Sequence, residues 1–275
     1  MDKTKTENCA ADTGLPASKI TYREPLGDFH GVKAEIVGHC VWDYPANTLA
    51  LRLPQPKWVL CAYQGYRKVT SVLNCFHPPE SWHAVDNTDR TYWEYTRWIH
   101  REMLNQVAPG EKTALLFTGV DMHKHVMAEE TYEELWVQAW VTAGVKTNAL
   151  RIGRDAAYGI ERKGLWQPFD HKSPPQPGTI NIIVLTSSDL GQAAMASSFI
   201  TITEAKTAAL QDLDIRSSYN SKLQATGTST DQVCIVPGNG DRCFYVSGQV
   251  KLGEMIARAV TRGVTEAINK VRGEG

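Results

Sequence analysis

The sequence predicts an α/β or α+β fold in a single domain, with a mixed sheet covered by long helices. Short apolar segments separated by turn residues run through the first half of the chain, as in the strands of a sheet. Long helical patterns at 189–212 and 250–272 follow further strand patterns. The 275 residues can bury a substantial core, and we expect residues 21–275 to form the domain and the polar residues 1–20 a loose arm.

Four strand patterns precede the first helical pattern. Apolar and polar residues alternate over 32–53, where turn residues divide the segment into two strands. Two more strands are expected at 58–62 and 69–74, before a pair of prolines that disfavours a helix. Apolar residues at spacings of three and four over 88–107 predict an amphipathic helix, whose aromatic residues would pack in the core or line a ligand site.

Strand patterns resume after this helix. Strands are expected at 114–120, 135–145 and 178–186. The segment 147–177 is rich in glycine, proline and charge and has no periodicity. It therefore reads as a long surface loop, which raises its chance of being functional.

The last third of the chain contains both long helices. Ser188 and Asp189 are placed to cap a helix that runs to about position 212. A hairpin is predicted for 233–236 and 243–246, which flank a turn rich in glycine. The final helix has one apolar stripe opposite a charged face, so it is expected to cover the sheet.

Composition and charge argue against several classes of partner. The chain has 29 basic and 30 acidic residues, so its net charge of −1 produces no overall field that attracts nucleic acid. No apolar run approaches the roughly 20 residues of a membrane span. The six cysteines lie singly, without the Cys-x-x-Cys spacing of zinc or redox sites, which favours reduced thiols in a cytoplasmic protein.

We expect the function to be organised around residues 223–236. Threonines, a serine, a glycine and an aspartate precede a β-branched run, as in a polar loop that leads into a buried strand. Gly227 permits close approach of a ligand, Thr226 and Thr228 offer hydroxyls, and Asp231 offers a carboxylate. The same composition also suits a hydrogen-bonded turn whose side chains satisfy their own backbone.

Polar residues also stand among apolar ones in two neighbouring segments. Asn181 interrupts a buried strand, so it is either a structural bridge or a residue that points into a site. Glu204 and Lys206 lie two positions apart on a helix and cannot share a face. We therefore expect at least one of them to point away from solvent.

Three further residues could bind a metal if their backbone were extended. Asp121, His123 and His125 alternate, which on a strand would place all three on one side. Such histidine pairs in loops are commonly unliganded, so we predict no metal site and no required cofactor. A nucleophile elbow, a Walker loop and a Rossmann glycine fingerprint are all absent from the sequence.

Four motifs stand in the second half of the chain. They are Gly-Thr-Ile-Asn-Ile from Gly178, Thr-Glu-Ala-Lys-Thr-Ala-Ala-Leu from Thr203, Ala-Thr-Gly-Thr-Ser-Thr-Asp from Ala225 and Lys-Leu-Gly-Glu from Lys251. In this order and spacing they resemble the adenosylcobinamide amidohydrolases of corrinoid salvage. Segments from Thr118, Thr142 and Asn148 extend the similarity to about residues 69–275. The segment 61–66 departs from the family's Ser- and Gly-rich turn, which bears on substrate preference.

The resemblance implies hydrolysis of the amide that joins aminopropanol to the corrin ring, giving adenosylcobyric acid. Such a reaction needs an activated nucleophile, donors for the oxyanion and an acid for the leaving amine. We assign Asp231 as base, with Glu204 as the alternative, and Lys206 as electrostatic stabiliser or acid. Thr226, Thr228 and adjacent backbone amides would bind the oxyanion, and the nucleophile is either a water or Thr228.

The remaining expectations concern the substrate. The cobalt-containing corrinoid would be bound by residues of the matching segments, namely Asn74, Thr142, Asn181, Thr226, Gly227 and Lys251. A corrinoid-binding protein without turnover is one alternative, and an amidohydrolase for another corrinoid or tetrapyrrole is a second. A homo-oligomer is compatible with the sequence, which does not specify one.

Overall fold

The computed structural model describes residues 20–41, 44–78, 80–81, 101, 104–163, 165–169 and 178–273. Within them two long helices, α2 (Gln192–Asp212) and α3 (Lys251–Arg272), and a short 3-10 helix, η2 (Met122–Lys124), accompany the strands. The strands are β1 (Tyr22–Phe29), β2 (Val32–Val41), β3 (Tyr44–Cys61), β4 (Gly65–Phe76), β5 (Thr113–Thr118), β6 (Val126–Tyr132), β7 (Leu135–Ala143), β8 (Ala149–Leu150), β9 (Gly159–Arg162), β10 (Leu165–Pro168), β11 (Ile180–Thr186), β12 (Ser188–Leu190), β13 (Gly227–Thr228), β14 (Gln232–Val236) and β15 (Gly240–Cys243).

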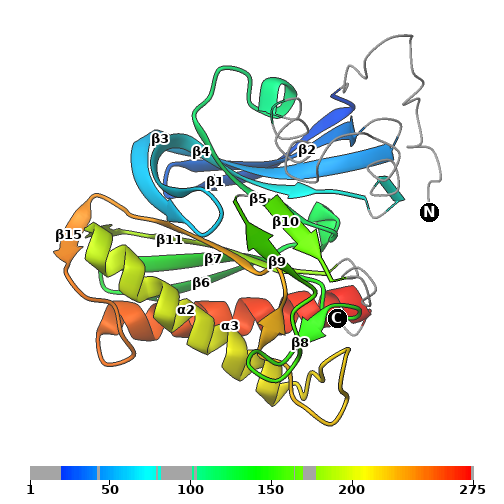
Figure 1. Cartoon of the computed structure of the whole chain (residues 1–275). Helices are drawn as coiled ribbons and strands as arrows, with labels where there is room; N and C mark the ends of the chain where they lie inside the picture. Colours follow the sequence, from blue (N-terminus) through cyan, green and yellow to red (C-terminus); the bar gives the residue numbers. More distant parts are fainter. Residues whose placement is uncertain are drawn as a thin grey trace.

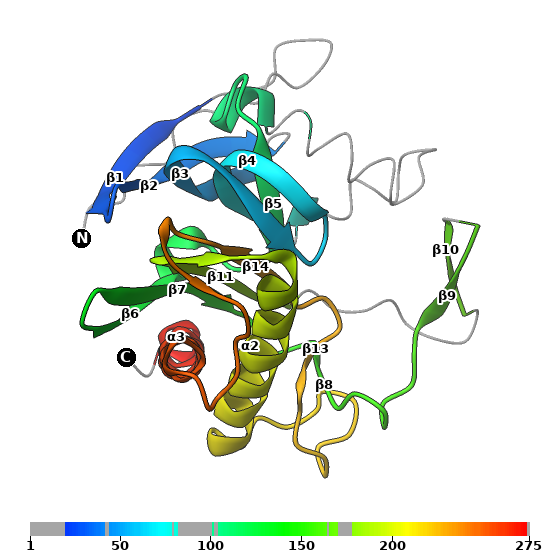
Figure 2. The same cartoon turned by 90° about the vertical axis from the view of Figure 1, so that its left-hand side faces the viewer.

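Nine strands of the described chain form one mixed sheet that folds back over itself (Figures 1 and 2). The order is β1-β2-β3-β14-β11-β7-β6, and β4 pairs with both β3 and β5 beside this path. The long strand β3 pairs with β2 and β4 and, near its end, with β14 through Leu60 and Cys61. It therefore joins an upper half, β1 to β5, to a lower half that consists of β14, β11, β7 and β6.

Apolar side chains fill the space between the two halves. Ile36 of the upper half belongs to the same buried cluster as Trp140 and Ile183 of the lower half. Phe29 meets the Trp140 ring edge-on, with ring centroids 5.3 Å apart. On its other face the lower half is covered by α2 and α3 (Figure 1), where Ile256 joins a second cluster. Because β11 is buried on both faces, its sequence is almost continuously apolar.

This mixed sheet with two covering helices confirms the predicted fold class. α3 and β11 lie where the apolar patterns place them. The segment 32–53 does contain two strands, β2 and β3. However, β3 continues to Cys61 across a register shift between Arg52 and Lys57, so it also takes in most of the strand predicted at 58–62.

The predicted hairpin after β14 is wrong. β15 pairs in parallel with β12 through residues that include Ser188 and Leu190. Ser188 and Asp189 are therefore strand residues, and α2 begins after Gly191 without a side-chain cap. The edge strands β1 and β6 have no clear pattern in the sequence, because Ala128 of β6 is the one buried residue that they contain.

Two predicted features fall largely outside the described residues. Residues 1–19 of the arm are among these, and so is most of the helix expected at 88–107 with its tryptophans. Of that segment the structure describes residue 101 and residues 104–107, which are helical. Val107 is buried in a third apolar cluster with Ala50 and Leu73 of the upper half.

The cysteines only partly match the expectation of reduced thiols. Cys61, Cys75, Cys234 and Cys243 are free. Cys40 is disulfide-bonded, so the expectation is wrong for this residue. Among the helices of the described chain, none is long and apolar enough to cross a membrane.

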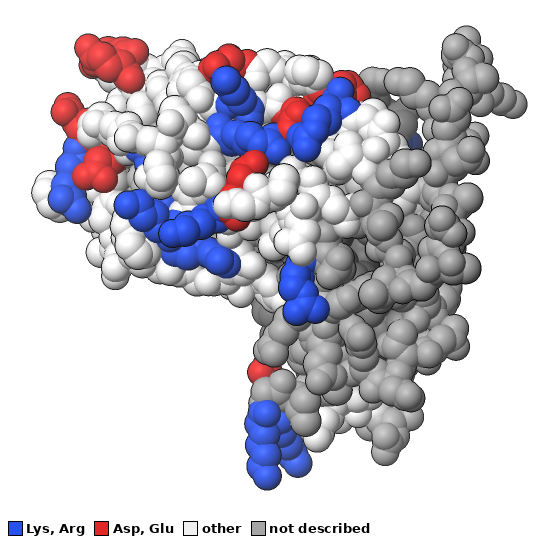
Figure 3. All heavy atoms as spheres, turned by 90° about the horizontal axis from the view of Figure 1, so that it is seen from above, with Lys and Arg blue, Asp and Glu red and all other residues white. Residues whose placement is uncertain are grey.

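Charged residues on the upper half of the sheet are arranged in pairs of opposite sign. Glu35 accepts a hydrogen bond from Arg23 at 2.6 Å and also pairs with Arg52, which contacts Glu111 at 3.0 Å. Seen from above, basic and acidic side chains of the described residues lie next to one another (Figure 3). The charges of the two signs therefore largely neutralise each other on this face.

Acid should destabilise the fold through His39, a buried residue of β2. Burial lowers the pKa of His39 to about 4, so the folded protein holds it neutral while the unfolded chain takes up a proton below pH 6.5. Stability present at pH 7 is therefore lost as the pH falls, by roughly 2 kcal/mol at pH 5 for this shift. Urea unfolding at both pH values should show this loss in the wild type and a smaller one in His39→Gln. Equal losses of stability in the two proteins would contradict the attribution of the acid effect to His39.

Candidate active site

Asp231 lies in the loop between β13 and β14, beside the first residue of β11. Four groups donate hydrogen bonds to its carboxylate. Thr228 donates from its hydroxyl at 2.5 Å and from its backbone N–H at 3.1 and 3.2 Å, and the N–H of Ile180 donates at 3.1 Å. The ammonium group of Lys206 completes the set with a short ion pair. Charge-assisted bonds of this kind fix the carboxylate in position.

Lys206 reaches this loop from α2. Its side chain is 9% exposed and that of Asp231 is 14% exposed, so the ion pair is largely removed from water. The neighbouring turn of α2 is also tied to the loop, because the Thr207 hydroxyl donates to the carbonyl of Thr226 at 3.1 Å. A desolvated pair of this kind needs both partners, since a single buried charge is costly. The helix therefore holds a cation against a carboxylate and a hydroxyl at one place.

Gly227 is required by the close approach of this pair. A Cβ atom at this position would lie 2.6 Å from Nζ of Lys206 and closer still to the Asp231 carboxylate. Real Cβ atoms do not approach other atoms so closely, so any side chain would push the pair apart. The sequence predicts that a ligand approaches Gly227 closely, whereas the groups that approach it in the structure are those of Asp231 and Lys206.

Replacing Gly227 with Ala should therefore lower both stability and activity. Overpacking of this kind costs about 1–3 kcal/mol. Urea unfolding and turnover can be compared with Gly248→Ala, a matched control because a Cβ atom there would have no neighbour within 4 Å. Equal stability and turnover of the two variants would contradict the claim that a side chain at position 227 displaces the ion pair.

The far side of the loop is held by residues that are not among the predicted site residues. Asn148 donates to the Ser229 hydroxyl at 2.6 Å and to the carbonyl of Gly178 at 2.9 Å. Tyr219 donates to Oδ1 of Asn148 at 2.6 Å, and burial raises the pKa of this phenol, so it keeps its proton. Asn148 lies in a segment that matches the family, which is the one signal that could have identified it.

Two other predicted residues near the loop do not join the cluster. The hydroxyl of Thr226 accepts from the N–H of Ile152 at 3.0 Å and its own N–H donates to the carbonyl of Leu150 at 2.9 Å, so it is used to hold β8. The structure thus uses Thr226 to hold β8, its oxyanion role stays a prediction, and the N–H of Thr228 is committed to Asp231. Glu204 lies on the exposed side of α2, away from Lys206, so the structure does not place this alternative base in the cluster.

Asn74, Thr142 and Asn181 form a separate buried group between the two halves of the sheet. Asn74 donates to the Thr142 hydroxyl at 3.0 Å, and Asn181 donates to Asn74 and to the carbonyl of Phe117, both at 2.7 Å. All three are at most 1% exposed. Asn181 follows Ile180 directly but projects to the other face of the sheet. The structure thus does not bring these three residues to the Asp231 cluster or to the surface.

Lys251 lies at the opposite end of the sheet. It begins α3, pairs with Glu254 at 2.5 Å and lies 4.8 Å from the ring centre of Tyr132. Tyr132 ends β6, beside the start of β7 that pairs with the end of β11. The Asp231 cluster adjoins the start of β11, and the seven residues of that strand span about 20 Å. The structure therefore does not bring Lys251 to the Asp231 cluster, and its predicted role in binding the substrate stays a prediction.

The alternating residues Asp121, His123 and His125 are not on a strand. Asp121 caps η2 and accepts from the backbone N–H of His123 at 2.8 Å. Nδ1 of His125 instead contacts the carbonyl of Met122 at 2.6 Å. Within the described ranges, no group of three or more His, Cys, Asp or Glu residues is arranged to hold a metal ion.

The Asp231 cluster contains the components of a hydrolytic site. The carboxylate accepts a hydrogen bond from a hydroxyl that could act as nucleophile, and a fixed cation lies beside them. Ser229 and Thr230, which flank the hydroxyl and the carboxylate, are exposed, so the cluster lies next to solvent. This combination of base, nucleophile and positive charge is suited to acyl transfer.

The chain is similar to several known proteins. The chain is 40% identical over 228 residues to an uncharacterized protein of Methanocaldococcus jannaschii, covering 82% of this chain and 86% of the relative. Two distant structural likenesses each cover 82% of this chain and 78% of the other. They are a Pyrococcus horikoshii protein, with a TM-score of 0.36 and 10% identity, and the L-aminopeptidase D-Ala-esterase/amidase of Ochrobactrum anthropi, with a TM-score of 0.37 and 9% identity.

A family model assigns the chain more directly. The model of adenosylcobinamide amidohydrolase matches residues 34–275, which include every strand and helix of the described chain except β1 and the first residues of β2. The match contains Lys206, Gly227, Thr228 and Asp231, which the fold brings together. The chain belongs to the adenosylcobinamide amidohydrolase family.

Proposed function

We propose that this protein hydrolyses the aminopropanol amide of adenosylcobinamide, giving adenosylcobyric acid, and that it does so in the cytoplasm. The proposal rests on one observation above all. The Thr228 hydroxyl donates at 2.5 Å to a carboxylate, Asp231, that is fixed by the buried cation of Lys206. Membership of the family supports the corrinoid as substrate.

In the first step, Asp231 accepts the proton of the Thr228 hydroxyl as Oγ1 attacks the amide carbon. A carbon–oxygen bond forms, and the carbonyl oxygen becomes an oxyanion beside the positive charge of Lys206. Collapse of this intermediate breaks the carbon–nitrogen bond, and the proton held by Asp231 passes to the leaving amine. The products of the step are aminopropanol and an ester on Thr228.

In the second step, water hydrolyses the ester. Asp231 takes a proton from the water as its oxygen attacks the ester carbon, and Oγ1 of Thr228 leaves with that proton. Adenosylcobyric acid and free enzyme result. Asp231 therefore acts as the base predicted from the sequence, and Lys206 acts as the electrostatic stabiliser.

The hydrogen bonds of Asp231 favour Thr228 over a directly activated water in the first step. Oδ1 already accepts from Ile180 and from both donors of Thr228, and Oδ2 accepts from Lys206 and from the Thr228 N–H. A water would have to displace one of these donors. The threonine hydroxyl is already positioned with its proton directed at the base.

Product analysis tests the proposed function. Purified protein is incubated with adenosylcobinamide, and the corrinoids are separated by liquid chromatography and identified by mass spectrometry. We expect adenosylcobyric acid in an amount equal to the released aminopropanol. Unchanged adenosylcobinamide bound to the protein would contradict the proposal and favour a corrinoid-binding protein without turnover. If product formed only from a different corrinoid, that corrinoid would be the substrate in place of adenosylcobinamide.

A further inference from the structure

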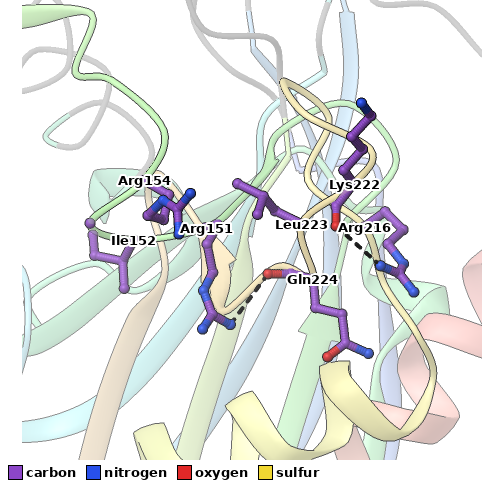
Figure 4. Close-up of a pocket in the computed structure, with 8 residues that line it drawn as sticks. Arg151, Ile152, Arg154, Arg216, Lys222, Leu223 and Gln224 are labelled. Atoms are coloured by element: carbon purple, nitrogen blue, oxygen red, sulfur yellow. Dashed lines mark hydrogen bonds between the residues drawn. The ribbon is translucent and has the colours of Figure 1, made fainter.

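Figure 4 shows a pocket lined by basic residues. It is an open hollow of about 630 Å³, bordered by the loop after β8 and by the segment between α2 and β13. The first loop contributes Arg151 and Arg154, and the second segment contributes Arg216 and Lys222. Four cations around one hollow contrast with the mixed charges on the upper half of the sheet.

The acidic residues near this pocket neutralise only part of its charge. Asp214 pairs with Arg216 at 2.5 Å. Asp155 is occupied by the backbone N–H of Arg151 and by the Ser217 hydroxyl, at 2.6 and 2.7 Å. Arg154 and Lys222 have no acidic partner among the described residues and are exposed. The pocket therefore has a positive charge available for a ligand.

Backbone carbonyls of the pocket fix the positions of two of its arginines by hydrogen bonds. Arg151 donates to the carbonyl of Gln224 at 3.5 Å across the hollow (Figure 4), and Arg216 donates to the carbonyl of Lys222 at the same distance. The Gln224 side chain donates to Asp214 at 2.8 Å. An isolated pairing of Arg216 with Gln224 ties the two strands of this segment together.

The pocket is linked to the Asp231 cluster through β8 and β13. Ile152, between the two arginines of the loop, donates its N–H to the Thr226 hydroxyl at 3.0 Å. Thr226 is only two residues before Thr228, a separation of about 7 Å along an extended chain. A ligand in the pocket would therefore lie near the bond that Thr228 is placed to attack.

We propose that this pocket binds a phosphate group. Arginine forks and a lysine match the geometry and charge of phosphate oxygens, and the open shape admits a group that remains attached to a larger molecule. One source is a phosphate ester on the hydroxyl of the aminopropanol arm, only a few bonds from the scissile amide. This first source depends on the proposed function. The second source is free phosphate or a nucleotide, and it is independent of the proposed function.

Binding of inorganic phosphate to the full chain tests the site itself. Calorimetric titration should show saturable binding to the wild type that weakens at least tenfold in R154Q/K222Q and is retained in R154K/K222R. The double variant R258Q/K270Q removes an arginine and a lysine of α3 and should bind as the wild type does. Because Arg154 and Lys222 are exposed, all variants are expected to fold, which circular dichroism can check. Absence of saturable binding, or equal binding by R154Q/K222Q, would overturn the proposal.

Hydrolysis of two substrates distinguishes the sources. If the phosphate ester is the ligand, kcat/KM for adenosylcobinamide phosphate should fall at least tenfold in R154Q/K222Q while that for adenosylcobinamide stays unchanged. If both substrates respond alike but inorganic phosphate still binds, free phosphate or a nucleotide is the ligand. If phosphate binds and neither corrinoid is cleaved, the proposed function fails and the pocket stands. If adenosylcobinamide is cleaved but phosphate does not bind, the proposed function stands and the phosphate pocket fails.

Discussion

Asp231→Asn should lower kcat for adenosylcobinamide by about 10²- to 10⁴-fold, the usual contribution of a positioned general base. An amide keeps the size of the carboxylate, but it cannot take the proton of the Thr228 hydroxyl that now lies 2.5 Å away. Steady-state rates measured by product chromatography give the effect. The expected loss is in kcat, because the substrate itself would still bind.

Two variants on α2 serve as comparisons for this loss. Glu204→Gln removes the carboxylate that the sequence offered as an alternative base, and its exposed position predicts an unchanged rate. Asp212→Asn removes an exposed acid at the end of the same helix and controls for a general change in charge. A large loss in Glu204→Gln together with normal turnover in Asp231→Asn would reverse the assignment of the base.

Lys206→Met should destabilise the fold by about 3–5 kcal/mol, the cost of leaving one partner of a buried ion pair uncompensated. Methionine retains the aliphatic packing of the side chain but leaves the Asp231 carboxylate without its cation. The side chain of Lys206 is only 9% exposed, so water cannot readily replace the ammonium group. Urea unfolding monitored by tryptophan fluorescence measures the change in the free energy of unfolding.

A double-mutant cycle separates the ion pair from packing. Lys206→Met combined with Asp231→Asn should be more stable than the sum of the single effects predicts, because the unpaired charge is gone. Lys270→Met, at an exposed end of α3, provides a control with the same chemical change. Additive effects in the cycle would indicate that the two side chains do not stabilise one another.

The fold brings together three of the residues that the sequence predicts for the site, Lys206, Thr228 and Asp231. Thr228 and Asp231 come from one short segment, and Lys206 stands out because it cannot share a helical face with Glu204. Asn148 and Tyr219 were not recognised, since their contacts with the loop depend on tertiary structure. Lys251 belongs to a motif that matches the family in sequence, but in the fold it lies beyond the far end of β11, about 20 Å from the Asp231 cluster.

Asn181 illustrates a second limit. Its backbone neighbour Ile180 donates to Asp231, but alternate residues of a strand point to opposite faces. The sequence therefore places Asn181 near the site without specifying on which side of β11 its amide lies. Its amide bonds to Asn74, which is 107 positions away in the chain, so the structural bridge that the sequence allowed is the arrangement found.

The same distinction applies to the fold. Periodicity alone places α3 and β11, because one has a continuous apolar stripe and the other is buried on both faces. The pairing of β15 with β12 was not predicted, since a short strand close to β14 in sequence reads as its hairpin partner. Which strands pair depends on how β3 bends between the two halves of the sheet, and local patterns do not determine that bend.

The most direct test of the account is to look for an ester on Thr228 during turnover. The protein is mixed with excess adenosylcobinamide, quenched in acid within the first turnover, and digested for peptide mass spectrometry. We expect the peptide that contains Thr228 to gain the mass of the corrinoid acyl group, and Thr228→Ala to give neither the adduct nor the product. Product formation by Thr228→Ala at the wild-type rate, with no adduct on the native protein, would contradict the proposed nucleophile.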